Sequence, residues 1–362
     1  MSPAKLAPGT VPGMSSIDEH GGWPGVLTLL LDRHHLTADQ ARAAMSTILA
    51  GDATPAQLIG FVVALRAKGE SAEELSGLLD AVLAACQIVP LTEDQRDNAV
   101  DIVGTGGDHS HSINVSTMAA IVVAGAGVPI CKHGARAASS KCGAADVLEA
   151  LGVVLDLTPD GVKHCVDTAG IGFCFAPSFH PAFRFAAPSR REIGVPTVFN
   201  LLGPMANPGR VRRQVIGVAN SAFAERMIET LKSHGSRRAW VVHGGDLDEL
   251  STTDRSDVIE LDHGEVRHFR VDPQELGLPR VRDEDLVGGE PPENAEFVRR
   301  VLAGERGPHR DIVVLNAGAG LVVAGRATDL PEGLTLAEHS IDSGAAATTL
   351  ERFVAASREA AG

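Results

Sequence analysis

From Val100 onward, short runs rich in β-branched residues alternate with glycine turns and with segments of helical spacing. The strand-type runs are VDIVG (100–104), VPICKHG (128–134), IGFCF (171–175), RRQVIGV (212–218) and RAWVVHG (238–244). Helix-type runs lie between them, such as NVSTMAAIVVAGAG (114–127) and AADVLEALG (144–152). This alternation is typical of a central sheet flanked by helices. The sequence therefore predicts an α/β domain, which we place at residues 96–362.

A β-hairpin is expected near residues 256–272, where VIELDHGEVRHFRV carries a turn at Asp262–Gly264. A hairpin adds antiparallel strands to parallel ones, so the predicted sheet is mixed.

The preceding part of the chain has helix caps instead of strand runs. Capping-box patterns at three points are each followed by apolar residues at helical spacing. The pairs are Thr37 with Gln40, Thr54 with Gln57 and Ser71 with Glu74, and the first two helices should end at Gly51 and Gly69. We predict a flexible lead at residues 1–22 and a small all-helical domain at 23–95. The basic segment 176–195, which contains several prolines, is expected to return to this domain as a helix.

Composition narrows the function classes. Hydrophobic residues make up 44% of the 362 residues, as in soluble globular proteins. Lys and Arg total 32 against 46 Asp and Glu, giving a net charge of −14, which argues against nucleic-acid and anionic-membrane partners. No apolar run is long enough to span a membrane, and the N-terminus has no apolar leader. Five irregularly spaced cysteines indicate reduced thiols and a cytoplasmic protein.

The first chemical motif is DIVGTGGDHSHSINVST at residues 101–117. Gly104, Gly106 and Gly107 let backbone N–H groups approach an anion closely, and the next helix adds the positive end of its dipole. The pattern favours a phosphate cradle, although a plain strand–turn–helix connection has the same composition.

The second motif is KHGARAASS at residues 132–140, which combines two cations, a histidine and two hydroxyls with little apolar bulk. It follows another predicted strand, and phosphate sites in α/β folds usually lie at the carboxyl ends of strands. Two cradles would hold two separate phosphate groups, whereas a solvated basic turn is the alternative.

Two further motifs supply acids and arginines. VVHGGDLDELSTTD (241–254) places acidic side chains after a strand, and in a phosphate-binding protein these usually hold Mg²⁺. In PSFHPAFRFAAPSRRE (177–192), arginines and His180 could bind a carboxylate, and the phenylalanines could line the site of a flat ring. Arg184 and Arg191 would share one helical face. The alternative for residues 241–254 is a solvated turn, and the alternative for residues 177–192 is an amphipathic surface helix.

Together the motifs predict a cytosolic, Mg²⁺-dependent enzyme that acts on a multiply phosphorylated small molecule. The sequence shows no Ser-His-Asp or Cys-His arrangement and no Walker A motif, and GTGGD is not a GxGxxG fingerprint. Kinases and dehydrogenases are therefore disfavoured.

GTGGD…NVST, KHGxRAASS, RREIGVPTVFNLLGPMANP and LDELSTT together resemble the anthranilate phosphoribosyltransferase family, in that family's order and over most of the chain. The resemblance implies a transferase, specifically a glycosyltransferase, of tryptophan biosynthesis. Its reaction joins 5-phosphoribosyl 1-pyrophosphate to the amine of anthranilate, giving N-(5-phosphoribosyl)anthranilate and pyrophosphate. It also implies two Mg²⁺ ions, small-molecule substrates and a cytoplasmic homodimer paired through the helical domains.

Matching positions imply the roles of individual residues. The implied catalytic residues are Lys132, Arg136 and His133, with His133 one candidate to take the amine proton. The implied metal ligands are Ser116, Asp248 and Glu249. The phosphoribosyl pyrophosphate ligands would be Gly104, Gly107, Asp108, Ser112, Asn114, Val115, Ser116, Thr117, Lys132, Ser139, Ser140 and Ala144. The anthranilate contacts would be Gly104, Ala135, Pro177, His180, Phe183 and Arg190.

Ala135 departs from the family's KHGNRAASS pattern, in which an asparagine contacts anthranilate. Losing one hydrogen bond to a charged group costs about 1.5–3 kcal/mol. The chain is then an altered variant, a natural enzyme that tolerates the loss, or a paralogue that uses another aromatic amine. His109 and Phe183 are further departures. A pyrimidine nucleoside phosphorylase-like enzyme stays open, as does a nucleic-acid-binding relative, which the charge of −14 opposes.

Overall fold

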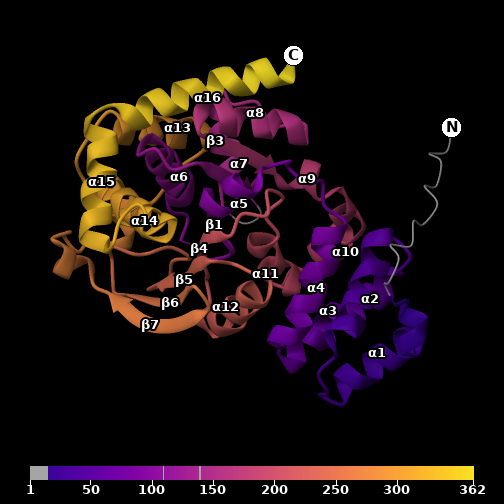
Figure 1. Ribbon diagram of the computed structural model, residues 1–362. Helices are drawn as coiled ribbons and strands as arrows, with labels where there is room; N and C mark the ends of the chain where they lie inside the picture. Colours follow the sequence, from indigo (N-terminus) through magenta and orange to yellow (C-terminus); the bar gives the residue numbers. More distant parts are fainter. Residues whose placement is uncertain (1–14, 109, 138–139) are drawn as a thin grey trace. The chain divides into compact units, whose positions relative to one another are not determined.

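The computed structural model describes residues 15–108, 110–137 and 140–362 (Figure 1). Contacts between residues divide the chain into two units. The first contains the residues up to Cys86 together with His180–Leu202, and the second contains Gln87–Phe179 together with Gly203–Gly362.

The first unit is all helical, as the capping patterns predict. Gln40 N donates to Thr37 Oγ1 at 3.2 Å and Thr37 N donates to Gln40 Oε1 at 3.0 Å, so both halves of this capping box form. The boxes at Thr54 and Ser71 close in the same way. The predicted ends are also confirmed, since Gly51 and Gly69 cap the second and third helices. The helices are α1 Gly22–Leu31, α2 Ala38–Ala50, α3 Pro55–Lys68 and α4 Ala72–Ala84.

Part of the predicted flexible lead is ordered. Ile17–His20 form the 3₁₀ helix η1, and Ser16 N donates to Glu19 Oε1 at 3.0 Å. Ile17 buries its side chain, which explains why this turn is fixed. The prediction of a flexible lead is therefore wrong from Ser16 onward, and residues 1–14 lie outside the described residues.

The basic segment after the third strand is not one helix. It forms three short pieces, α9 Ala176–Phe179, η2 Pro181–Phe185 and α10 Ala187–Ile193. Pro181 lacks the N–H that a continuous helix would need at that point. Arg184 lies in η2 and Arg191 in α10, so the predicted shared helical face is absent.

Close packing of α2 against α4 gives a test of the helical unit. A Cβ at Gly77 would lie 2.0 Å from the carbonyl oxygen of Ala38, so Gly77→Ala forces the two helices apart. We expect a loss of about 1–3 kcal/mol in the free energy of unfolding, measured by urea denaturation. Gly60→Ala is the control, because its Cβ would lie 3.7 Å from a Leu27 methyl and alanine favours the helix. A Gly77→Ala protein as stable as Gly60→Ala would contradict this packing.

The second unit contains a seven-stranded sheet in the order β3-β2-β1-β4-β5-β6-β7 (Figure 1). The pairs from β3 to β5 are parallel, and β6 and β7 are antiparallel, so the predicted mixed sheet is confirmed. The predicted hairpin turn lies between Asp262 and Glu265. The strands are β1 Val100–Gly104, β2 Ile130–Gly134, β3 Ile171–Phe175, β4 Arg213–Gly217, β5 Arg238–Gly244, β6 Ser256–Asp262 and β7 Glu265–Val271.

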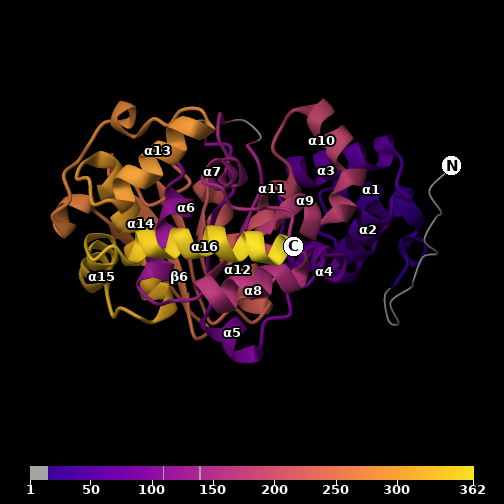
Figure 2. The same cartoon turned by 90° about the horizontal axis from the view of Figure 1, so that it is seen from above.

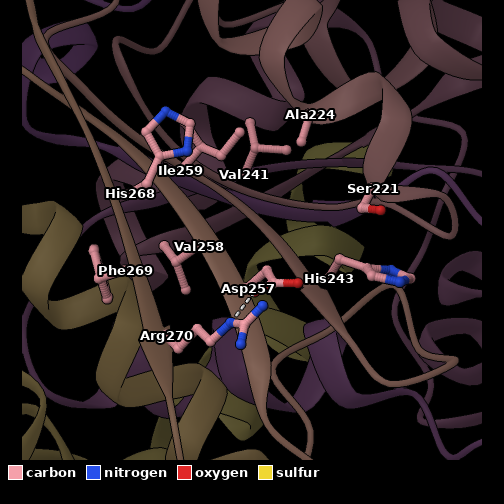
Figure 3. Close-up of a pocket in the computed structure, with 10 residues that line it drawn as sticks. All are labelled: Ser221, Ala224, Val241, His243, Asp257, Val258, Ile259, His268, Phe269 and Arg270. Carbon is pink, nitrogen blue, oxygen red and sulfur yellow. Dashed lines mark hydrogen bonds and ion pairs between the residues drawn. The ribbon is translucent and has the colours of Figure 1, made fainter.

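Helices cover both faces of this sheet. Trp240 and Val242 of β5 belong to the main core, which also contains the buried residues of α6 and α14. Val241 and His243 point to the other face, where Val241 lies near Ala224 of α12 and His243 lies on the side of Ser221 (Figure 3). In Figure 2, α16 lies across α6 and α8. The α-helices are α5 Glu93–Asn98, α6 Val115–Gly125, α7 Ala144–Ala150, α8 Pro159–Ala169, α12 Ala224–Ser233, α13 Pro291–Leu302, α14 Pro308–Ala324, α15 Leu330–Asp342 and α16 Ala345–Ala361.

Short 3₁₀ helices and one shared helix complete the chain. They are η3 Ser221–Phe223, η4 Pro273–Leu276, η5 Asp283–Leu286 and α11 Val198–Met205, which contains the unit boundary at Leu202. Within residues 15–362, leaving out the three undescribed positions, no helix is both long and apolar enough to cross a membrane.

Candidate active site

The GTGGD loop follows β1 and is locked to the acidic loop that follows β5. Gly106 N donates to Asp248 Oδ2 at 2.7 Å. A Cβ at Gly104 would lie 2.2 Å from the same carboxylate oxygen, and one at Gly217 would lie 1.5 Å from the Asp248 carbonyl oxygen. Glycine is thus required at both strand ends. Gly107 adopts a φ of 78°, which suits the concave nest of N–H groups that the sequence predicts.

Lys132 brings the first three motifs together. Its side chain is 2% exposed, and Nζ donates to the Ile102 carbonyl of β1 and lies 3.4 Å from Ser116 Oγ of α6. Burial lowers the pKa of Lys132, while Asp101, Glu249 and Asp248 act in the opposite direction. A buried ammonium surrounded in this way is well placed to meet an anion at the ends of β1 and β2.

The acidic loop divides into buried and exposed members. Asp246 and Asp254 are exposed, whereas Asp248 is buried and Glu249 is half-buried. Burial, reinforced by the neighbouring charge of Asp108, raises the pKa of Asp248 to about 7. Burial and the Asp248 charge likewise raise the pKa of Glu249. These carboxylates repel one another, as expected of groups that share a cation.

This donor set suits Mg²⁺, which takes oxygen ligands and usually keeps water and substrate phosphate oxygens around it. Over the described part of the chain, no three His, Cys, Asp or Glu side chains form a complete metal cage. Two acidic side chains and the Ser116 hydroxyl beside Lys132 fit an ion that reaches the protein together with a diphosphate.

Asn114 and Ser112 shape the first cradle and tie it to its surroundings. Asn114 Nδ2 donates to the Cys142 carbonyl at 3.0 Å, and its Oδ1 accepts from Asn294 Nδ2 at 2.8 Å. Ser112 forms a β-bridge with Val287. The Asn114 side chain therefore links the loop after β1 to the loop before α7.

Two further members of this cradle are buried. Val115 opens α6 inside the core. Thr117 is 1% exposed and lines a small enclosed space with Lys132 and Phe173. From these two residues, backbone N–H groups rather than side chains are the expected phosphate donors. Asp108 accepts from Ser110 Oγ at 2.7 Å, which fixes its carboxylate.

In the KHGARAASS loop, His133 is buried and anchored at two points. Its backbone N donates to Asp101 Oδ1 at 3.1 Å, and Nδ1 lies 3.0 Å from the Gly203 carbonyl oxygen. Because a carbonyl only accepts, this contact assigns the hydrogen to Nδ1 and the basic lone pair to Nε2. Ala135 is exposed, so a larger side chain has room there.

Arg136, predicted as catalytic, is directed toward α7. Its guanidinium donates to Asp146 Oδ1 at 2.9 Å and to Glu149 Oε2 at 2.8 Å, and these carboxylates raise its pKa. The structure therefore does not bring Arg136 to the Lys132 cluster, and its catalytic role stays a prediction. Ala144 begins α7, Ser140 is exposed, and the predicted ligand Ser139 lies outside the described residues.

The predicted acceptor residues of the helical unit form an aromatic cluster. His180 stacks on Phe183 with centroids 5.1 Å apart, and Phe183 meets the edge of Phe199 at 5.5 Å. The Arg190 guanidinium lies 4.9 Å from the Phe199 centroid, and burial lowers its pKa. Across the described residues no carboxylate forms a salt bridge with Arg190. Pro177 belongs to the second unit and is exposed.

A cavity of about 360 Å³ lies elsewhere, on the face of β5, β6 and β7 beside α12 (Figure 3). Its ionisable side chains already have partners, because Arg270 Nε donates to Asp257 Oδ1 at 2.8 Å and His268 Nε2 lies 3.4 Å from Glu225 Oε1. No predicted site residue lines it. The cavity is therefore separate from the Lys132 cluster.

Comparison with known proteins decides the family. The chain matches the model of the glycosyl transferase family a/b domain over residues 96–347 and that of its helical bundle domain over residues 24–86. It is 50% identical over 321 residues to an anthranilate phosphoribosyltransferase from Rhodopseudomonas palustris (strain BisB5), an alignment covering 88% of this chain and 94% of the relative. An anthranilate phosphoribosyltransferase from Methylobacterium radiotolerans is 52% identical over 321 residues, covering 88% and 92%. The chain belongs to the anthranilate phosphoribosyltransferase family.

Solved members of the anthranilate phosphoribosyltransferase family share the fold. The crystal structure of the Thermus thermophilus enzyme has a TM-score of 0.86 at 42% identity and covers 92% of this chain and 99% of that one. The Saccharomyces cerevisiae enzyme, in complex with phosphoribosyl pyrophosphate (PRPP) and Mg, has a TM-score of 0.84 at 29% identity and covers 93% and 98%. Both the predicted family and the predicted fold class are therefore confirmed.

Sequence reasoning missed several residues that shape this family site. Asp101 and Asn207 lie directly behind His133, and Phe199 completes the aromatic cluster around Arg190. For Asp101 the only local signal was an aspartate inside the apolar run VDIVG. Phe199 and Asn207 lie in the motif RREIGVPTVFNLLGPMANP, but the motif alone did not reveal their partners, because these contacts depend on the packing of distant segments.

Proposed function

We propose that this chain transfers the 5-phosphoribosyl group from PRPP to the amine of anthranilate, releasing pyrophosphate, in tryptophan biosynthesis. The observation that carries the proposal is the convergence of Lys132, Ser116, Asp248 and Glu249 on one end of the sheet, in a chain about half identical to anthranilate phosphoribosyltransferases. No observation favours the nucleoside phosphorylase or nucleic-acid alternatives.

The donor side explains how the C1–oxygen bond of PRPP is weakened. As this bond breaks, positive charge grows on the ribose ring and negative charge on the departing pyrophosphate. The buried Lys132 ammonium and the N–H groups of the exposed Gly107 nest are proposed to stabilise that negative charge. Ser116, Asp248 and Glu249 would hold Mg²⁺, which we propose as two ions and which would supply positive charge to the diphosphate.

The acceptor side orients the amine. Arg190 lacks a carboxylate partner among the described residues and is proposed to bind the carboxylate of anthranilate, while Pro177, His180 and Phe183 contact its ring. The amine becomes acidic once it bonds to carbon. His133, with its lone pair on Nε2, is proposed as one acceptor for that proton.

The test is product analysis with purified protein, PRPP and Mg²⁺. Anthranilate, substituted aromatic amines, and thymidine with inorganic phosphate are supplied in separate reactions, and products are identified by mass spectrometry. The proposal expects phosphoribosylated anthranilate and equimolar pyrophosphate. Turnover of another amine alone would contradict the acceptor assignment, and phosphorolysis of thymidine alone would contradict the reaction class.

Assembly and location are also proposed. Leu31 of α1 is 73% exposed and Val63 of α3 is 44% exposed, which favours a partner surface on the helical unit. We propose a cytoplasmic homodimer that pairs through this unit. The proposed domains are a helical domain at residues 23–95 with the returning segment 176–195, and an α/β domain at residues 96–362. Light scattering should give twice the mass of one chain, and Leu31→Asp should halve it. A wild-type monomer would exclude the dimer.

Ala135→Asn should strengthen acceptor binding. The exposed position leaves room for the amide, which supplies the hydrogen bonds that alanine lacks. We expect kcat/KM for anthranilate to rise about 10- to 100-fold, with the KM for PRPP unchanged. Ala135→Leu is the matched control, since leucine has a similar size but no amide. Equal effects of the two substitutions would refute a hydrogen bond to the acceptor.

A further inference from the structure

A carboxylate is buried at the centre of the sheet behind the proposed donor site. Asp101 lies on β1 and is 0% exposed. Its Oδ1 accepts from the backbone N of His133 at 3.1 Å, and its Oδ2 accepts from Asn207 Nδ2 at 2.7 Å. Burying a carboxylate in an apolar strand costs stability unless hydrogen bonds and a counter-charge compensate it.

The Lys132 side chain lies against this stretch of β1. The charge of Asp101 favours the Lys132 ammonium, as do the charges of Glu249 and Asp248. The Lys132 ammonium also donates to the carbonyl of Ile102, the residue next to Asp101. Both the charge and the backbone of this stretch of β1 therefore act on the same ammonium.

Asn207 completes the support. Its Nδ2 donates to the Cys131 carbonyl at 2.8 Å as well as to Asp101, and its Oδ1 accepts from Gly209 N at 2.7 Å. Asp101 and Asn207 thus fix the backbone on both sides of Lys132, at Cys131 and at His133. The start of the KHGARAASS loop is held in place from behind.

A purely structural carboxylate exists elsewhere in the chain for comparison. Glu74 of the helical unit is equally buried and accepts from Leu36 N at 2.9 Å, Ser71 N at 2.7 Å and Lys68 Nζ at 2.8 Å. Its contacts join helices of the first unit. It provides the same burial and hydrogen bonding as Asp101 without a connection to the Lys132 cluster.

We propose that Asp101 is a positioning residue of the donor site, which together with Asn207 holds the backbone on both sides of Lys132, at Cys131 and His133, in the geometry that directs the ammonium to the diphosphate of PRPP. The inference rests on the proposed function and deepens it. Asp101 does not touch PRPP itself and acts through Lys132. Removing the Asp101 carboxylate should therefore weaken PRPP binding only when Lys132 is present.

A double-mutant cycle tests this relation, with the dissociation constant of PRPP in Mg²⁺ buffer measured by calorimetry. Asparagine at position 101 has one acceptor oxygen and no charge, so it cannot replace both hydrogen bonds. Asp101→Asn should weaken binding about tenfold, and by less than about twofold in a Lys132→Gln background. Glu74→Gln, the control, should lower the melting temperature and leave PRPP binding unchanged in both backgrounds.

The outcomes separate the two claims. Failure of the wild type to bind PRPP overturns the proposed function and this inference with it. If the wild type binds PRPP, two results overturn the inference but not the proposed function. Either Asp101→Asn leaves PRPP binding unchanged, or it weakens binding equally with Lys132 and with Lys132→Gln. If Asp101→Asn does not fold, Asn207→Ala takes its place, with an expected weakening of about threefold that is again lost with Lys132→Gln. A stability loss in Asn207→Ala without weaker PRPP binding overturns the inference.

Discussion

Replacing Lys132 with glutamine lowers kcat/KM for PRPP by about 100- to 1,000-fold, the range observed when one preorganised donor to a developing anion is removed. The reason is its location. The ammonium is 2% exposed and lies beside Ser116, with Asp101, Asp248 and Glu249 as its electrostatic partners. Bulk water cannot replace it, so the charge on departing pyrophosphate loses its fixed counter-charge. Steady-state kinetics with varied PRPP measure the effect.

Lys141 supplies the matched control for this prediction. It is an exposed cation of the same loop, and Lys141→Gln should change kcat/KM by less than about twofold because solvent screens an exposed charge. A Lys132→Gln enzyme with nearly normal kcat, or equal losses in the two variants, would mean that the loop acts only through its general positive field.

Asp248→Asn should remove activity and stabilise the ligand-free protein at the same time. The carboxylate is a proposed Mg²⁺ ligand, so its loss should cost at least about 100-fold in kcat/KM. Yet it is buried next to Asp108 and Glu249, which makes its charge unfavourable in the folded state. An amide keeps the shape, and its oxygen can still accept from Gly106 N. Sites that trade stability for function behave in this way.

The pH dependence follows from the pKa of Asp248, which is about 7 in the folded protein against an ordinary value of 3.8. Between these values the folded state binds the proton more tightly than the unfolded state, so this group lowers stability as pH rises from 3.8 to about 7. Asparagine resembles the protonated form. The gain in melting temperature from Asp248→Asn should therefore be smaller at about pH 5 than at about pH 8, where it is largest.

This experiment is done in the presence of a chelator, so that a bound cation does not offset the repulsion. Asp246→Asn is the control, because Asp246 is exposed on the same loop and its substitution should alter neither stability nor turnover. A melting temperature lowered by Asp248→Asn at pH 8 would show that its charge stabilises the ligand-free fold.

Local rules were enough to predict the capped helices of the first unit and the strands of the second. Capping boxes such as Thr37 with Gln40 involve neighbours three residues apart, and strand runs such as VDIVG are read from consecutive residues. The segment 176–195 was predicted as one helix because its arginines have helical spacing, although it contains several prolines. Pro181 has no backbone N–H, and the chain begins a separate 3₁₀ helix there.

The sequence marked Lys132, Asp248 and Glu249 as candidates because their motifs carry the relevant chemistry, and their roles stay predictions. The candidate site was not predictable where the partner lies far away in the sequence. Arg136 looked available as part of KHGARAASS, but Asp146 and Glu149 of the next helix bind its guanidinium. The sequence indicated only that Asp101 lies in a strand. Its hydrogen bond to Asn207, 106 positions further along the chain, is visible only in the structure. Such pairings depend on topology rather than on local pattern.

The most direct measurement of the central claim is the stoichiometry of one reaction. Purified protein is mixed with PRPP, Mg²⁺ and anthranilate, and anthranilate fluorescence and released pyrophosphate are followed together, with and without a chelator. The account predicts one pyrophosphate for each anthranilate consumed, and no consumption once Mg²⁺ is removed. Pyrophosphate release that does not depend on anthranilate, or unchanged turnover in the chelator, would contradict it.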